Sequence, residues 1–184
     1  GSGVGKPKVY TYVPEWFKMT LPPGIALDGE IWIGRGLFQK TSRLSTIKPG
    51  KSYTETQIND IWAGKEDPPV IFKVFDIPTE KSPFEQRMKM LQTIVKDRKD
   101  CWNQLKYENK KVFPLQFTEQ VKIKSMEQLV NLYTKLTSAG AEGIMLRADG
   151  SPYETKRSKY MLKYKIKEDA ECKVRGYTMG EGRL

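Results

Sequence analysis

Two carboxylates stand two positions apart in the segment Leu27-Asp28-Gly29-Glu30. In a β-strand, residues at this spacing project from the same face of the sheet. Two carboxylates on one strand face are able to hold a hard divalent cation or a sugar hydroxyl. A solvent-exposed acidic face with a glycine bulge is the commoner explanation for such a tetrapeptide taken alone.

The segment 161–167 carries lysines at alternating positions, Lys163, Lys165 and Lys167. In a strand these three side chains share one face. A row of ammonium groups facing inward would suit phosphate groups. A solvated edge strand is the alternative, because lysines are often placed on sheet edges.

Two other segments contribute candidate functional side chains. Glu142 opens a strand pattern that Arg147 closes, directly after a helix is predicted to end. Phe75 lies near the end of an apolar run, where its ring is able to stack on a base. The simpler explanations are a capped helix before a core strand, and a phenylalanine that fills the core, as phenylalanines usually do.

Short strands and a few helices must position these groups. Apolar spacing predicts a helix over 54–62, a second after an N-cap at Ser82, and a third from an N-cap at Ser125 to a stop at Gly140. The polar, basic stretch 44–53 is expected to form a mobile loop. Without strict β–α alternation, the pattern indicates an α+β fold with mainly antiparallel sheets and flanking helices. Strands are predicted over 25–33, 70–77, 112–123, 143–147, 161–166 and 172–178.

The composition narrows the chemistry further. The 184 residues contain 32 Lys and Arg against 22 Asp and Glu, a net charge of +10, and no histidine. The missing histidine excludes Ser-His-Asp and Cys-His relays and histidine metal sites within this sequence. No apolar run approaches the ~20 residues of a transmembrane helix, so no membrane association is expected. The charge indicates a polyanionic partner, a nucleic acid or a nucleotide, although a generically basic soluble domain would share it.

The order of these segments resembles motifs III, IIIa, IV and V of the covalent nucleotidyltransferases. The four pieces are LDGE, a strand ending in VFD, EGIMLR and LKYKIKEDAE. Longer stretches such as LDGEIWIGRGLFQ, SPFEQRMKML and VRGYTMGEG are similar to ATP-dependent DNA ligases of the compact bacterial and viral type. The resemblance runs from about residue 13 to the end. It implies an α+β, ATP-grasp-like nucleotidyltransferase fold, an adenylation domain.

The resemblance implies a reaction that uses ATP, Mg²⁺ and nicked duplex DNA. A lysine attacks the α-phosphate of ATP, the AMP passes to the 5′-phosphate at the nick, and the 3′-hydroxyl then displaces AMP. A monomer inside the cell is expected, whether in the nucleus, the cytoplasm or a viral factory. The candidates for contact with DNA or its phosphates are Arg147, Arg157 and Lys159.

The resemblance also implies roles for individual residues. Phe75 resembles the aromatic residue that stacks on adenine, in ATP or in bound AMP. Glu30 resembles the catalytic carboxylate near the ribose and the metal, and Asp28 is its companion. Glu142 resembles the second metal ligand. The lysines that resemble the catalytic pair holding the α-phosphate are Lys163 and Lys165.

The sequence departs from the family where the nucleophilic lysine is expected. No K-x-D-G motif occurs, because neither Asp28 nor Asp149, which begin the two Asp-Gly pairs, has lysine two residues before it. Residues 1–184 are therefore expected to form a partial adenylation domain, without motif I and without the following oligonucleotide-binding (OB) domain. A missing segment, a non-catalytic nucleic-acid-binding homologue and a variant that uses another lysine are the alternatives, and the intact motifs III to V favour the first. An RNA ligase or an mRNA capping guanylyltransferase is the alternative within the superfamily.

Overall fold

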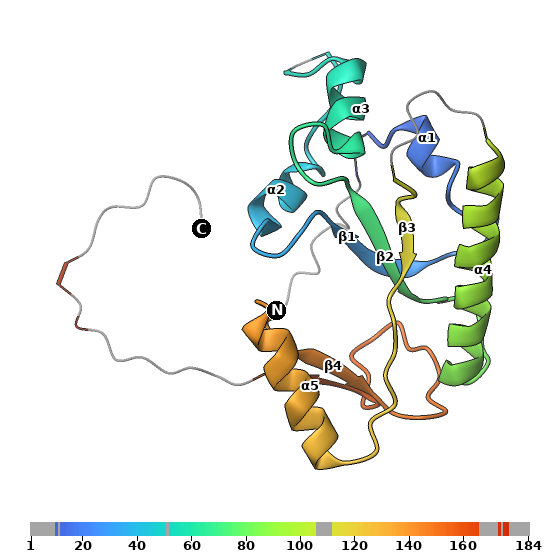
Figure 1. The fold of residues 1–184 in the computed structure, drawn as a ribbon, viewed down its shortest axis with the longest axis vertical. Coiled ribbons are helices and arrows are strands. Elements are labelled where there is room, and N and C mark those ends of the chain that lie inside the picture. Colours follow the sequence, from blue (N-terminus) through green and yellow to red (C-terminus); the bar gives the residue numbers. More distant parts are fainter. Residues whose placement is uncertain are drawn as a thin grey trace.

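A three-stranded sheet forms the centre of the computed structural model, which describes residues 10, 12–50, 52–105, 112–165, 173 and 175–176. Strands β1 (Asp28–Trp32), β2 (Ile71–Asp76) and β3 (Leu115–Phe117) lie side by side in that order. β1 runs antiparallel to β2, whereas β3 runs parallel to β2 (Figure 1).

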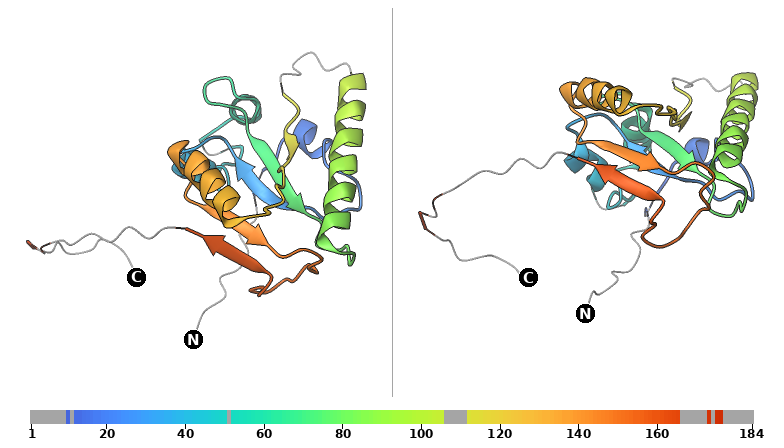
Figure 2. Two further views of the ribbon diagram at one scale, coloured as in Figure 1. Left: turned by 60° about the horizontal axis from the view of Figure 1, so that its bottom comes forward. Right: turned by 90° about the horizontal axis from the view of Figure 1, so that it is seen from below.

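A second sheet, made of two strands, lies beside the first. β4 (Ile144–Arg147) pairs antiparallel with β5 (Met161–Tyr164) (Figure 2). Helix α5 (Met126–Ser138) packs against this pair through Tyr133, whose ring lies edge-on to that of Tyr164 with 5.0 Å between centroids. Helices that flank small, mainly antiparallel sheets confirm the predicted α+β fold.

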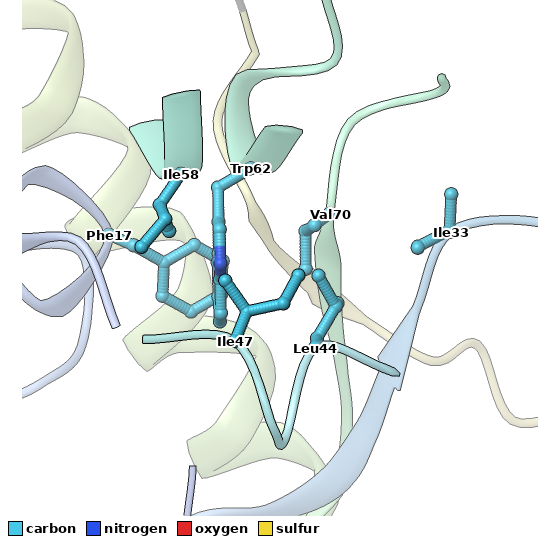
Figure 3. Packing of buried hydrophobic residues seen from close by; sticks show 7 residues of the cluster. All are labelled: Phe17, Ile33, Leu44, Ile47, Ile58, Trp62 and Val70. Carbon is cyan, nitrogen blue, oxygen red and sulfur yellow. The ribbon is translucent and has the colours of Figure 1, made fainter. Parts of the chain in front are cut away.

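The first hydrophobic core is formed where α1 (Glu15–Lys18), α2 (Phe38–Arg43) and α3 (Glu55–Ala63) meet the first sheet. Trp62 of α3 packs edge-on against Phe17 of α1, with 4.8 Å between ring centroids. Helix α3 confirms the short helix predicted over 54–62. Figure 3 shows the buried members of this core, which are Phe17, Ile33, Leu44, Ile47, Ile58, Trp62 and Val70.

The segment 44–53, predicted as a mobile polar loop, contributes to this core. Leu44 is 1% exposed and Ile47 is 6% exposed. Backbone hydrogen bonds from Leu44 to Thr41 and from Thr46 to Arg43 continue α2 as turns. In its described residues the segment forms turns and no helix or strand, as the loop prediction requires, and its mobility stays a prediction. The burial of Leu44 and Ile47 was not expected, because the polar majority of the segment concealed two apolar residues three positions apart, the spacing of one helical face.

The second core lies between the first sheet and α4 (Phe84–Gln104), which runs along β2 and β3 (Figure 1). This helix confirms the one predicted after residue 83. Its apolar residues recur at the spacing of one helical face, and each one buried there removes apolar area from water. The buried residues of this core are Val74, Ile77, Met88, Leu91, Val95 and Leu115.

Helix starts were predicted correctly for α5 but not for α4. The Ser125 side chain accepts a hydrogen bond from the backbone N–H of Gln128 at 3.1 Å, as its capping pattern predicts. Ser82 was expected to cap α4, but the N-cap is Pro83 and no side chain caps the helix. The carbonyl oxygen of Ser82 instead accepts a hydrogen bond from Nη1 of Arg87 at 2.6 Å. The buried Arg87 thus contacts the backbone of the residue that was predicted to cap the helix.

One of the predicted strands is much shorter in the structure. The strand expected over 112–123 is limited to residues 115–117. The strand expected over 172–178, like Lys167, lies mostly or wholly outside the described residues. Within the described part of the chain, no helix has the length and apolar character needed to span a membrane.

Gly29 lets β1 and β2 approach each other closely at the LDGE segment. A Cβ at this position would lie 2.5 Å from the carbonyl oxygen of Lys73 and 2.7 Å from ring carbon Cε2 of Phe72. The pairing register also shifts between Asp28 and Gly29, which is the irregularity that a glycine bulge predicts.

The buried side chain of Asp76 joins β2 to α4 and to the second sheet. Arg87 donates from Nε to Oδ1 at 2.7 Å and from Nη2 to Oδ2 at 3.2 Å. Arg147 of β4 donates to the same Oδ2, and Arg87 donates to the carbonyl oxygen of Ser151 at 2.9 Å. Burial acts to raise the pKa of Asp76, but hydrogen bonds from Arg87 and from the Ile77 N–H, together with the arginine charges, hold it below its usual value.

Gly29→Ala should destabilise the protein by about 1–3 kcal/mol, because the added methyl group overpacks a backbone contact. Denaturant titration of the variant measures this cost. Gly176→Ala is the control, because a Cβ there meets no atom within 4 Å. A Gly29→Ala protein as stable as the wild type would contradict the close approach of β1 and β2.

Asp76→Asn should cost about 3–5 kcal/mol of unfolding free energy, because it leaves the buried Arg87 without its carboxylate. Asp149→Asn, which breaks an exposed ion pair with Lys122, should change stability little. Because the folded pKa of Asp76 is lowered, its stabilisation is present above the unfolded value of about 4 and disappears as the pH falls through the folded value. The stability difference between wild type and Asp76→Asn should therefore shrink at acidic pH, and a constant difference would argue against this pair.

Candidate functional site

Three residues predicted from the sequence come together where β4 begins and β5 ends. The Nζ atoms of Lys163 and Lys165 lie 3.8 and 3.7 Å from Oε2 of Glu142. The two lysine side chains are 58% and 48% exposed, and the carboxylate is 78% exposed. We call Glu142, Lys163 and Lys165 the lysine–carboxylate cluster. Its two cations are thus held at one point and remain open to a ligand.

The antiparallel register explains how this cluster forms. Ile144 pairs with Tyr164 and Met145 with Lys163, so the chain just before β4 passes the end of β5. Gly143 permits this passage, because a Cβ there would lie 2.5 Å from the carbonyl oxygen of Tyr164. The glycine of EGIMLR therefore brings together the two chain segments that carry the cluster.

A second group of side chains lies on β1 and β2. Lys73 is the cross-strand partner of Glu30, and its Nζ lies 3.6 Å from the ring centroid of Trp32. Burial lowers the pKa of Lys73 and the charge of Arg35 lowers it further, whereas Glu30 acts to raise it. Sequence reasoning missed Lys73 and Trp32, because their contact depends on a pairing register that no local pattern encodes.

Asp28 is bound by a residue from the loop between β4 and β5. The hydroxyl of Tyr153 donates to Oδ2 of Asp28 at 2.8 Å. Burial raises the pKa of Tyr153 to about 12, and the hydrogen bond and charge of Asp28 add to this rise. Tyr153 therefore stays a neutral donor at neutral pH. It was also missed, since 125 positions separate it from its partner.

Phe75 lies next to Asp76 in β2 and is half-buried. Phe75 is not among the described residues that form either hydrophobic core or pack against one. The simpler expectation for Phe75 was that it fills the hydrophobic core. Stacking on adenine stays a prediction, and it requires a ring with accessible surface.

The three candidates for DNA contact lie in different surroundings. Arg147 is paired with Asp76, its side chain is 17% exposed, and its guanidinium carbon lies 4.8 Å from the ring centroid of Phe84. Arg157 and Lys159 are exposed in the loop between β4 and β5. DNA contact stays a prediction for all three, and for Arg147 it competes with a role inside the protein.

Hard oxygen donors are available for a magnesium ion at Glu30 and Glu142, both of them exposed. Across the described residues, no three or more acidic or cysteine side chains gather as a ready-made metal site. Magnesium, however, usually keeps several waters and is held by one or two carboxylates together with substrate phosphates. Each of these exposed carboxylates has the donor chemistry to bind an ion that arrives with a nucleotide.

Together these groups can stabilise negative charge on a phosphate and bind a polar, aromatic ligand next to it. The lysine–carboxylate cluster supplies fixed cations, and the first sheet supplies acidic and aromatic side chains. Phosphoryl transfer depends mainly on positioning and on such charges, and no histidine is required.

Comparison with known proteins gives consistent results. A family model described as "ATP dependent DNA ligase domain" matches residues 6–165. A DNA ligase of Haemophilus influenzae is 23% identical over 171 residues, which cover 93% of this chain and 54% of that protein. A DNA ligase of Archaeoglobus fulgidus is 26% identical over 185 residues, covering 93% of this chain and 28% of that protein. A solved Lig E DNA ligase, studied for DNA binding with a minimal scaffold, matches with a TM-score of 0.61 and 26% identity over 84% of this chain and 51% of that one.

These relatives carry the name of DNA ligases, so they do not favour the RNA ligase or capping enzyme alternatives. The chain spans about half the length of the Haemophilus protein and of the solved ligase, and less of the Archaeoglobus protein. The motifs, the α+β fold and a family model that matches most of the chain agree. The chain belongs to the ATP-dependent DNA ligase domain family.

Proposed function

We propose that this chain is part of the adenylation domain of a protein that seals nicks in duplex DNA with ATP. In the proposed reaction a lysine amine attacks the α-phosphorus of ATP, a P–N bond forms, and pyrophosphate leaves. The AMP then moves to the 5′-phosphate at the nick, and the 3′-hydroxyl displaces it. The observation that carries the proposal is the lysine–carboxylate cluster.

This cluster suits a phosphate that gains charge during transfer. Lys163, in β5, and Lys165, just after the end of β5, both lie near one carboxylate oxygen of Glu142, so their ammonium groups are already gathered. Cations placed before the reaction stabilise the developing charge without reorganising. We propose that these two lysines bind the α-phosphate, and that Glu142 keeps them in place until the nucleotide arrives.

The nucleotide's base and ribose are assigned to the first sheet. Phe75 would stack on adenine, and Glu30 with Asp28 would face the ribose. Magnesium, when bound, supplies further stabilisation of phosphate charge, and Glu30 and Glu142 are the residues that would hold it. The support for this assignment is the exposure of both carboxylates and the position of Phe75 outside both cores.

The proposed partner is nicked duplex DNA, which the basic surface would bind through phosphates. Arg157 and Lys159 are the exposed candidates, and the net charge of +10 favours a polyanion. We propose that the protein acts as a monomer inside the cell, where its nucleotide and its DNA are found. The nucleophilic lysine has no counterpart among the motifs of this chain, so its position must be found by experiment.

Incubation of the full-length protein with Mg²⁺ and ATP labelled at the α-phosphate should yield a covalent lysyl-AMP that survives denaturing electrophoresis. Peptide mapping then locates the nucleophilic lysine. Lys163→Ala should lower adduct formation by about 100-fold or more, the usual cost of removing one group that stabilises transition-state charge. Lys96→Ala, on the exposed side of α4, is the matched control.

Absence of any adduct on the complete wild-type protein would overturn the proposed function. Equal losses in Lys163→Ala and Lys96→Ala would overturn the assignment of the cluster. Sealing of nicked DNA, compared with sealing of nicked RNA by the same preparation, tests the substrate class.

The DNA affinity of the protein should fall as salt rises, because bound phosphates release counterions. Replacing both Arg157 and Lys159 by glutamine should reduce the slope of log affinity against log salt by about 1–2. The control removes two exposed lysines of α4, Lys96 and Lys99, and should leave the slope closer to that of wild type. Fluorescence anisotropy with a nicked duplex measures both, and identical slopes would remove Arg157 and Lys159 from the DNA contact.

A further inference from the structure

Arg147 connects the two sheets at a point next to both halves of the candidate site. Its guanidinium binds Asp76 of β2, and Asp76 directly follows Phe75. Within the second sheet, Arg147 of β4 pairs with Met161 of β5, two positions before Lys163. One ion pair therefore joins Asp76, the residue after the proposed adenine platform, to β4, the strand that pairs with the one carrying Lys163.

The strand register shows which way the lysines face. Residues two apart on one strand, and residues directly opposite on the partner, share one face of an antiparallel pair. Arg147 and Met145 thus lie on the same face as Met145's partner, Lys163. The side of the β4–β5 pair that carries Lys163 is therefore the side through which Arg147 reaches Asp76. At ~3.3 Å per residue, Lys163 lies about 7 Å along the strand from the level of Arg147.

The pairing of Asp76 does not depend on Arg147 alone. Arg87 makes two hydrogen bonds to the same carboxylate, and both side chains are fully buried, whereas the Arg147 side chain is 17% exposed. Arg87 and Asp76 belong to the first sheet and its helix, so they would stay paired without Arg147. Within this network Arg87 also holds the loop after β4, through the carbonyl oxygen of Ser151, and the bond from Arg147 is the contact that attaches β4 itself to β2.

We propose that Arg147 is a positioning residue, which holds the lysine-bearing face of β4–β5 at a fixed distance from Phe75 so that both can contact one nucleotide. The inference rests on the proposed function. In this proposal Arg147 fixes the position of β4 inside the protein. This role replaces the expectation that Arg147 contacts DNA.

The test compares Arg147→Gln with wild type in the full-length protein, using single-turnover formation of lysyl-AMP across a range of ATP concentrations. The maximal rate should fall at least 10-fold while half-saturation by ATP changes less than 3-fold. The reason is that the bonds of Arg87 to Ser151 and of Tyr153 to Asp28 remain, and only the placement of β4 beside Lys163 is loosened. Arg147→Lys keeps a cation for Asp76 but lacks the rigid guanidinium plane, so it should recover only part of the rate. In a Lys163→Ala background the loss caused by Arg147→Gln should become smaller, since residues that act through one another are not additive.

The matched control is Arg98→Gln. Arg98 also ties α4 to another segment, through a hydrogen bond from Nε to the carbonyl oxygen of Thr20 at 3.2 Å, but it touches neither β4 nor β5. Its rate should stay within 2-fold of wild type. An equal loss in Arg98→Gln would reduce Arg147 to a general stabilising residue and overturn the proposal.

Two other outcomes would also overturn it. A normal adenylation rate in Arg147→Gln, with a reduced salt slope of DNA binding, would mean that Arg147 contacts DNA directly. An Arg147→Gln protein that matches wild type in both measurements would remove the residue from the reaction altogether. If wild type itself forms no lysyl-AMP, the proposed function fails first, and that result is distinguishable because no variant is needed to see it.

Discussion

The arrangement of this domain depends on the ion pairs that the buried carboxylate of Asp76 forms with Arg87 and Arg147. A buried charge without partners costs several kcal/mol, so Asp76 requires the arginines that surround it. Arg87 brings the start of α4 onto β2, and Arg147 brings β4 to the same point. One side chain, that of Asp76, thus binds both α4 and β4. Helix α4 covers the first sheet, and β4 belongs to the sheet next to the lysine–carboxylate cluster.

Local pattern predicted those parts of the site that local geometry determines. Lys163 and Lys165 follow strand alternation, and Glu142 stands where a helix ends and a strand begins, so a short antiparallel pair was enough to assemble them. The contact between Lys73 and Trp32 needed the register of two strands about 40 positions apart, which alternation leaves open. Leu44 and Ile47 were missed for a related reason, because their burial depends on a core built from other segments.

The absence of histidine fits this division of the site between two sheets. A reaction that transfers a phosphoryl group needs cations close to the phosphate and a means of fixing the nucleotide. In the proposed reaction Lys163 and Lys165 would meet the first need without a proton relay. The second need depends on the distance between the two sheets. Groups on different strands can act on one ligand only if the distance between those strands is fixed.

Arginine suits this holding role for a physical reason. A guanidinium presents several N–H donors in a rigid plane, so it fixes direction as well as distance, whereas an ammonium group on a flexible stem fixes neither as well. Arg87 makes four hydrogen bonds, to Asp76 Oδ1, Asp76 Oδ2 and the carbonyl oxygens of Ser82 and Ser151. Arg147 adds a second positive charge that lowers the pKa of Asp76, and it is the arginine that comes from β4. Its contribution is best understood as orientation of β4, and through β4 of the lysines paired beside it.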